Sequence, residues 1–173
     1  MLIEYGNKRP QVAEGAFIAP TAVLIGDVTV EKDAGIWFGA VLRADLGPIV
    51  VKEASSIQDN AVVHVIPHTP AIIEEEVVVA HGAVLHSCRI GQGSLIGMNA
   101  VVMDRGEVGE QSVVAAGSIV TEGSYVPPRH LVAGIPAKTK KEIDEETLQW
   151  IKQGAATYRD LTRIYLKQGI DKI

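Results

Sequence analysis

Aliphatic residues recur at every sixth position along most of this chain, and the residue four positions later is usually an alanine or a serine. The aliphatic positions fall into four runs: Val12, Ile18, Leu24, Val30, Ile36 and Leu42; Val51, Ile57 and Val63; Ile73, Val79 and Leu85; and Ile90, Ile96, Val102, Val108, Val114, Val120 and Val126. A large residue every six positions with a small residue between them is typical of a triangular coil in which three such sides make one turn. The pattern therefore predicts an all-β solenoid, a parallel β-helix of hexapeptide repeats with about six turns between Val12 and Val126.

Two short insertions separate the runs, one around Gly47-Pro48 and one from Pro67 to Pro70, and the step from Leu85 to Ile90 is one residue short. A single turn cannot bury its own aliphatic residues, so stability must come from the stacking of each turn on the next, and the two ends need caps. We assign the N-terminal cap to residues 1–11.

Near the C-terminus the period of six gives way to a helical period. The apolar residues then alternate in steps of three and four: Leu148, Ile151, Ala155, Tyr158, Thr162 and Tyr165. This spacing predicts a helix from Glu145 to about Lys167, with Asp144 as its N-cap and Gly169 as its terminator. We expect the helix to lie along the outside of the coil, and we divide the chain into a β-helix domain over 1–137 and a C-terminal helix within 138–173.

Composition narrows the classes of function. Hydrophobic residues make up 47% of the chain but aromatic residues only 5%, so small and branched aliphatic side chains must fill the core. The net charge of −5, with no basic cluster outside Lys138–Lys141, argues against nucleic acid as the main partner. The N-terminus does not resemble a signal peptide and no apolar run is long enough to span a membrane, so we expect no membrane association and a cytoplasmic location.

Four of the five histidines lie between Ile57 and His86, and three of them, His64, His81 and His86, lie amid small and aliphatic residues. When the sides of the coil are counted from Val12, the third side of three successive turns carries Leu42, Val63 and Leu85. The residues that follow these three point outward, because side chains alternate along a strand; they are Arg43, His64 and His86. Adjacent turns stack about 4.8 Å apart, so His64 and His86 can share a metal.

His81 follows Val79 by two residues and therefore lies on a different side of the coil. Its side chain points away from the pair formed by His64 and His86, but it can reach the pair of a neighbouring subunit. The register thus predicts a homotrimer with three metal sites at its interfaces. Three histidine ligands leave a fourth position for water, as in catalytic zinc sites, and the same ligand set also suits Fe²⁺ or Co²⁺.

Five segments carry a resemblance to the γ-class carbonic anhydrases, which are left-handed β-helix trimers with zinc or iron at the subunit interfaces. They are GIWFGAVLRAD at 35–45, SIQDNAVVH at 56–64, AHGAVLH at 80–86, IGMNAVV at 96–102 and VAGIPAK at 132–138. The resemblance covers nearly the whole chain. It implies a left-handed coil and metal ligation by His64, His81 and His86, with His81 donated by the adjacent subunit.

Four further residues match functional positions of that family. The resemblance implies that Gln58 orients the metal-bound hydroxide and that Arg43 and Asp45 form an interface ion pair bordering bicarbonate; a purely structural pair is the alternative for these two. Tyr158 matches a tyrosine that approaches the site from a helix, and core packing is the alternative for it. His68 and His130 are best interpreted as loop residues, and Cys88 as a turn or core thiol.

The chain departs from the γ-class pattern where protons are transferred. Leu46 stands where characterised members have a glutamate, the uncharged segment VIPHTP follows His64 in place of an acidic loop, and Ser56 replaces a common asparagine. His68 is a candidate substitute for the missing proton shuttle.

The sequence thus favours a metal-dependent enzyme that reversibly hydrates carbon dioxide to bicarbonate. Three alternatives remain: a thioesterase that uses the same metal hydroxide, a hexapeptide acyltransferase that uses acetyl-coenzyme A, and a non-catalytic assembly protein that keeps the metal as a clasp. The acyltransferase reading leaves three histidines at one interface unexplained, because such enzymes typically need one. Measurements of metal content and of carbon dioxide hydration distinguish the remaining hypotheses.

Overall fold

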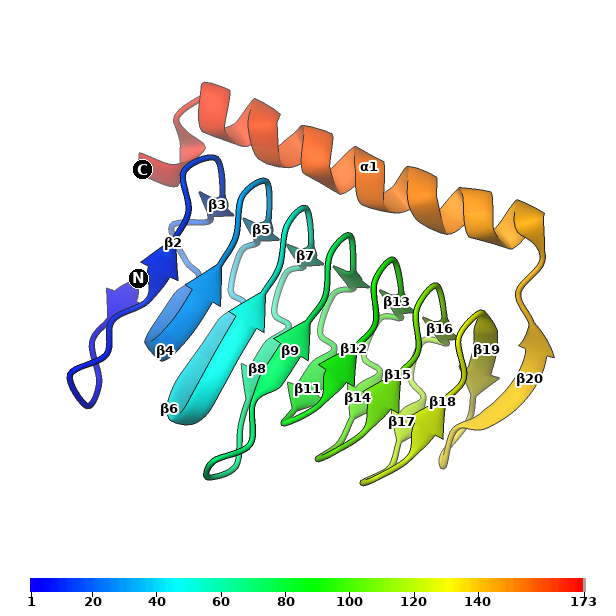
Figure 1. Cartoon of the computed structure of the whole chain (residues 1–173). Coiled ribbons are helices and arrows are strands. Elements are labelled where there is room, and N and C mark those ends of the chain that lie inside the picture. Colours follow the sequence, from blue (N-terminus) through cyan, green and yellow to red (C-terminus); the bar gives the residue numbers. More distant parts are fainter. Residues whose placement is uncertain (173) are drawn as a thin grey trace.

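The computed structural model of the chain describes residues 1–172. These residues form a left-handed parallel β-helix of about seven turns, followed by the helix α1 (Glu145–Lys167) and a short 3₁₀ helix, η1 (Ile170–Lys172). Figure 1 shows the coil as a row of stacked turns with α1 running along its length. The predicted solenoid and its C-terminal helix are therefore confirmed.

Short strands give the coil three faces. The first face contains β2 (Gln11–Val12), β9 (Ala71–Ile73), β12 (Arg89–Ile90), β15 (Glu107–Val108) and β18 (Tyr125–Val126). The second face contains β3 (Phe17–Ile18), β5 (Gly35–Ile36), β7 (Ser56–Ile57), β10 (Val78–Val79), β13 (Leu95–Ile96), β16 (Val113–Val114) and β19 (His130–Ala133). The third face contains β1 (Leu2–Ile3), β8 (Val62–His64), β11 (Val84–His86), β14 (Val101–Val102) and β17 (Ile119–Val120). Two longer strands, β4 (Val23–Val30) and β6 (Val41–Val51), bend from the third face into the first.

The six-residue period corresponds to stacked columns of buried aliphatic side chains. Leu42 pairs with Val63, Val63 pairs with Leu85, and all three are fully buried. Each such side chain stabilises the fold by roughly 1.5–3 kcal/mol through its removal from water. The small residues lie at the corners, where a serine hydroxyl can hydrogen-bond to a backbone carbonyl of the next turn. Ser94 Oγ, for example, donates to the carbonyl oxygen of Gly109 at 2.8 Å.

The coil extends beyond both ends of the predicted repeat. Leu2 pairs with Leu24 in β4, so part of the predicted N-terminal cap is itself a strand of the third face. At the other end Val132 in β19 pairs with Val114, six residues beyond Val126. A final strand, β20 (Lys138–Glu142), runs antiparallel to β19 and exposes its side chains, and lysines on such an edge hinder the addition of another chain. The domain division at residue 137 stays a prediction.

Helix α1 covers the second face of the coil. Its bounds match the predicted helix, Asp144 caps it by accepting from the Thr147 amide at 2.8 Å, and Gly169 follows its C-terminus with a positive φ. The buried residues Leu148 and Ile151 pack against outward-facing aliphatic residues of that face, namely Leu95, Val113 and Leu131. Within residues 1–172 no helix combines the length and apolar character needed to cross a bilayer, and the cytoplasmic location stays a prediction.

Two contacts hold the C-terminal part of α1 close to the coil. Gly35 lies under the helix, and a Cβ there would be 2.6 Å from Thr162 Oγ1. Asp33, which is 7% exposed, accepts from Arg163 Nε at 3.1 Å and from Arg163 Nη2 at 2.9 Å. These hydrogen bonds from Arg163 lower the pKa of Asp33.

The Asp33–Arg163 pair predicts a pH-dependent contribution to stability. We expect Asp33→Asn to lower the free energy of unfolding at pH 7 by about 1 kcal/mol, because half of the Arg163 side chain stays exposed and screened. The folded pKa of Asp33 is lowered, so its stabilisation is complete above the unfolded pKa of about 3.9 and is lost as the pH falls through the folded pKa. Urea unfolding of both proteins at one protein concentration, at pH 7 and at about pH 3, measures the difference between them. Asp160→Asn is the control, because Asp160 lies 3.8 Å from the same arginine in an exposed pair; a pH-independent difference for Asp33→Asn would contradict the assignment.

Candidate metal centre

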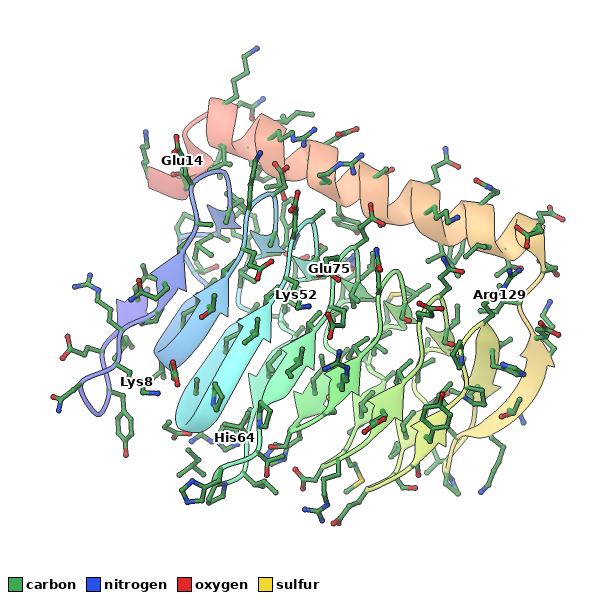
Figure 2. The ribbon with its side chains drawn as sticks, in the orientation of Figure 1. Lys8, Glu14, Lys52, His64, Glu75 and Arg129 are labelled. Carbon is green, nitrogen blue, oxygen red and sulfur yellow. The ribbon has the colours of Figure 1, made fainter. Side chains whose placement is uncertain are left out.

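His64 and His86 stack on the third face as the register predicts. Arg43, His64 and His86 pair with one another in successive turns, in β6, β8 and β11. The two imidazole centroids are 5.0 Å apart, and His64 Nδ1 lies 3.0 Å from His86 Nε2. Figure 2 shows His64 on the side of the coil away from α1. The predicted column of outward side chains is therefore present.

A carboxylate lies at the outer nitrogen of each ring in this pair. Asp45 Oδ1 is 2.9 Å from His64 Nε2, and Asp45 Oδ2 accepts from Arg43. Asp104 Oδ1 is 2.5 Å from His86 Nδ1. Burial opposes ionisation of Asp45, but the hydrogen bonds from His64 and Arg43 outweigh it, so the pKa of Asp45 lies below its usual value. Asp45 is thus an ionised acceptor shared by Arg43 and His64.

This arrangement fits a cation between the two rings. An ionised carboxylate can only accept hydrogen bonds, so the outer nitrogen of each neutral ring carries the proton. The inner nitrogens, His64 Nδ1 and His86 Nε2, then face each other with lone pairs at 3.0 Å. Two lone pairs repel at that distance unless a proton or a metal ion is shared between them, and neutral imidazole nitrogens are ligands that divalent zinc, iron and cobalt accept.

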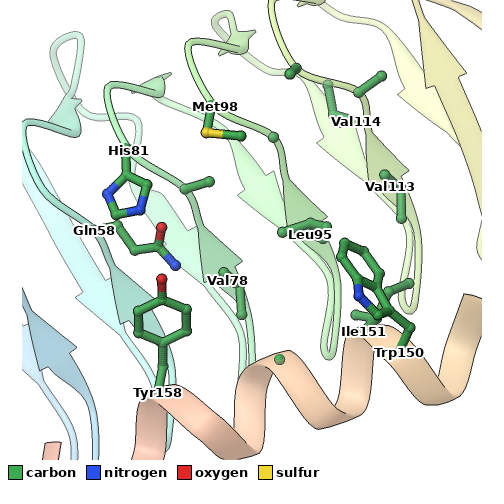
Figure 3. A pocket seen from close by; sticks show the side chains of 15 residues that line it. Gln58, Val78, His81, Leu95, Met98, Val113, Val114, Trp150, Ile151 and Tyr158 are labelled. Carbon is green, nitrogen blue, oxygen red and sulfur yellow. The ribbon is translucent and has the colours of Figure 1, made fainter. Parts of the chain in front are cut away.

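His81 lies on a different part of the coil, together with Gln58 and Tyr158. His81 is in the corner that follows β10, Gln58 follows β7 in the adjacent turn, and Tyr158 comes from α1. In Figure 3 the Gln58 amide lies between the His81 ring and the Tyr158 hydroxyl group. His81 is half exposed, whereas Gln58 is 3% exposed.

Backbone contacts with two turns fix the His81 corner. The His81 carbonyl oxygen accepts from the Asn99 amide at 3.0 Å, and the Gly82 amide donates to the Asp59 carbonyl oxygen at 2.9 Å. Gly82 has φ of +69°, and a Cβ there would clash with Asn99 Oδ1, so glycine suits this position. The corner therefore holds His81 in a defined position although its side chain is exposed.

Tyr158 and Ser56 both have structural partners. The Tyr158 ring packs 5.8 Å from the Trp37 ring, and burial, followed by the charge of Asp59, raises the pKa of Tyr158. Ser56 Oγ accepts from Trp37 Nε1 at 2.8 Å. Packing of Tyr158 against the coil is therefore observed, and it leaves the hydroxyl beside Gln58.

An apolar groove of about 410 Å³ opens beside His81. It runs between α1 and the second face toward the exposed Trp150, and its walls include Val78, Leu95 and Ile151 (Figure 3). The polar groups Gln58, His81 and Tyr158 lie together at one end. The groove thus joins an apolar space to the exposed face of His81.

One chain brings the seven predicted site residues together in two groups. Arg43, Asp45, His64 and His86 form the group on the third face, here called half-site A. Gln58, His81 and Tyr158 form the second group, here called half-site B. Within residues 1–172, no cluster of three or more histidine, cysteine or acidic side chains is placed to hold a metal ion.

The remaining histidines and the cysteine have separate surroundings. His68 is exposed in the loop between β8 and β9, at a hollow that Asp45 and Leu46 also line. His130 Nδ1 lies 2.7 Å from the Pro128 carbonyl oxygen at the far end of the coil. Cys88 is in the core, where burial raises its pKa to about 12.

Two aspartates beside the histidines were not identified from the sequence. Asp59 Oδ2 is 2.9 Å from His81 Nδ1, and Asp104 contacts His86 as described above. The register held a signal for Asp59, because it follows Ile57 by two residues as His81 follows Val79. Asp104 had no such signal, because it reaches His86 from a corner of the next turn.

Comparison with curated proteins gives clear relatives, although no family model matches the chain. The chain is 41% identical over 163 residues to the carnitine operon protein CaiE of Proteus sp. (strain LE138), covering 93% of this chain and 81% of that protein. It is 35% identical to the mitochondrial gamma carbonic anhydrase 2 of Arabidopsis thaliana, covering 96% of this chain but 62% of that longer protein.

Two solved structures are similar to this chain over nearly its whole length. A hexapeptide transferase family protein from Anaplasma phagocytophilum superposes with a TM-score of 0.92 at 41% identity, covering 95% of this chain and 98% of the other. A putative acetyltransferase from Bacillus cereus superposes with a TM-score of 0.94 at 36% identity, covering 95% and 96%. Together with the three histidines on a hexapeptide coil, these likenesses show that the chain belongs to the CaiE and γ-carbonic anhydrase-like family of left-handed β-helix proteins.

Proposed function

We propose that this protein is a homotrimeric, metal-dependent enzyme that hydrates carbon dioxide reversibly. The observation that supports the proposal is the separation of half-site A and half-site B on one chain. Half-site A offers two converging imidazole nitrogens, and half-site B offers a third, exposed imidazole that its own chain cannot bring to them. A cyclic trimer in which half-site B of one subunit meets half-site A of the next would supply three histidines to each metal.

The ligand set suits a catalytic metal with one open position. His64 and His86 from one subunit and His81 from the next would hold Zn²⁺, or Fe²⁺ or Co²⁺. A metal bound by three neutral imidazoles lowers the pKa of its bound water to about 7 and so supplies hydroxide near neutral pH. The Arabidopsis relative is a γ-class carbonic anhydrase by name, which is consistent with this chemistry.

The surrounding side chains have separate tasks in this proposal. Gln58 is buried beside His81, so its amide is held where it can accept or donate a hydrogen bond at the metal-bound water. Arg43, held by Asp45, places a positive charge beside half-site A, where it can attract bicarbonate. Tyr158 lies beside Gln58 and orients it. The groove provides the apolar space that carbon dioxide needs.

A second candidate function is a non-catalytic metal clasp between subunits. The observation that favours it is the lack of acidic side chains at the two positions where γ-class members transfer protons. Leu46 follows Asp45, and the loop after His64 carries His68 in place of carboxylates. The names of the solved relatives raise an acyltransferase as a further alternative, and a thioesterase would use the same metal. The acyltransferase alternative does not explain why three histidines are divided between two half-sites.

Removal of His81 tests the proposed enzyme. We expect His81→Ala to lose most of its bound metal and its hydration of carbon dioxide, because each site loses one of three ligands. Metal analysis of freshly purified protein and stopped-flow hydration assays measure both quantities. His130→Ala is the matched control, since His130 lies at the far end of the coil. Loss of metal without any hydration activity in the wild type would leave only the clasp.

The missing acidic side chain at position 46 predicts that one substitution raises activity. We expect Leu46→Glu to raise hydration turnover by about tenfold or more in weak buffer, since a carboxylate beside Asp45 can carry the proton away. The difference should shrink in concentrated imidazole buffer, which transfers protons itself. Leu46 is 46% exposed, so the charge is tolerated, and Ile135→Glu at the far end of the coil is the control. An unchanged rate would show that proton transfer near Asp45 does not limit turnover.

A further inference from the structure

An aspartate beside each half-site contacts a histidine ring at Nδ1. Beside half-site B, Asp59 Oδ2 is 2.9 Å from His81 Nδ1, an ion-pair contact without the alignment of a hydrogen bond. Beside half-site A, Asp104 Oδ1 is hydrogen-bonded to His86 Nδ1 at 2.5 Å. The two pairs lie on different sides of the coil, yet both leave Nε2 as the nitrogen directed away from the carboxylate.

The backbone of neighbouring turns sets both pairs. Asp59 lies one turn before His81, and its carbonyl oxygen accepts from the Gly82 amide at 2.9 Å. Asp104 lies one turn after His86, and the amide of the next residue, Arg105, donates to the Ser87 carbonyl oxygen at 2.8 Å. The aspartates are therefore held beside the rings by the stacking of the coil and not by the rings themselves.

A carboxylate at Nδ1 decides which form of the imidazole is present. A neutral imidazole has one N–H, and an ionised carboxylate only accepts, so the proton resides on Nδ1 and the lone pair on Nε2. That form can bind a metal without losing a proton first. A carboxylate bonded to the other ring nitrogen also orients the ring and makes it a stronger ligand.

We propose that Asp59 and Asp104 are positioning residues that fix His81 and His86 as Nδ1–H rings with Nε2 available to the metal. The inference rests on the metal site of the proposed function and adds one residue to each half-site. The Asp104 pair is the more buried, with side-chain exposures of 23% for Asp104 and 31% for His86, against 38% for Asp59 and 47% for His81. Asp104 should therefore have the larger effect, since its contact is a hydrogen bond and water screens the exposed Asp59 pair more.

The test uses the isosteric variants Asp59→Asn and Asp104→Asn in the full-length protein. An asparagine can donate to Nδ1 as well as accept from it, so the preference for the Nδ1–H form is lost. We expect about 10- to 100-fold weaker cobalt binding, measured by competition with a chelator, with Asp59→Asn at the lower end of that range. Asp27→Asn, which removes a carboxylate paired with Lys8, controls for the change in net charge.

A second measurement on metal-free protein separates positioning from structure. Long-range ¹H–¹⁵N correlation spectra report which ring nitrogen carries the proton. We expect the Nδ1–H form for His81 and His86 in the wild type, with Asp59→Asn changing only His81 and Asp104→Asn changing only His86. Nε2–H rings in the wild type, or variants that bind cobalt as tightly as the wild type, would overturn the inference. Wild-type protein with both expected forms but no cobalt binding would support the assignment of the rings and contradict the proposed metal site.

Discussion

The in-register stacking of one turn on the next is the constraint on which this molecule depends. Each turn is too small to bury its own aliphatic side chains, so the core exists only as columns that run through successive turns. A residue that slipped by one position would carry its aliphatic side chain out of the core and to the surface. The same register aligns the outward residues, which is why His64 stacks on His86 and His81 lies one turn from Asp59. The order of the core and the geometry of the site thus have one cause.

Much of the fold could be predicted because its periods are strong and local. The six-residue repeat gave the coil, the three-and-four spacing gave α1, and the register gave the column of Arg43, His64 and His86. The ends of the coil were harder, because β1 is a two-residue strand before the repeat begins and Val132 follows a pair of prolines. The face that α1 covers had an unused signal: the outward positions of the second face are apolar at Phe17, Val78, Leu95 and Val113.

The site was predictable only in part. Ligand positions follow from the register of the strands, but hydrogen bonds between side chains from different corners do not follow from any period. Asp104 was missed for this reason, and so was the role of Asp45 as an acceptor from both His64 and Arg43, whereas the register did hold a signal for Asp59. Tyr158 was placed on the inner stripe of α1, but its position beside Gln58 depends on how far the helix is displaced along the coil. Local pattern therefore identifies the candidate ligands, and tertiary packing identifies what orients them.

The central claim is that two half-sites on one chain complete each other only across a subunit interface. Co-expression of His64→Ala with His81→Ala tests it most directly, because each variant lacks one half-site and keeps the other. In every mixed cyclic trimer, one interface joins an intact half-site A to an intact half-site B. We predict that each variant alone binds almost no metal, whereas mixed trimers, isolated with two different affinity tags, regain about one metal per trimer. Mixed trimers as devoid of metal as the single variants, or single variants that keep their metal, would contradict the account.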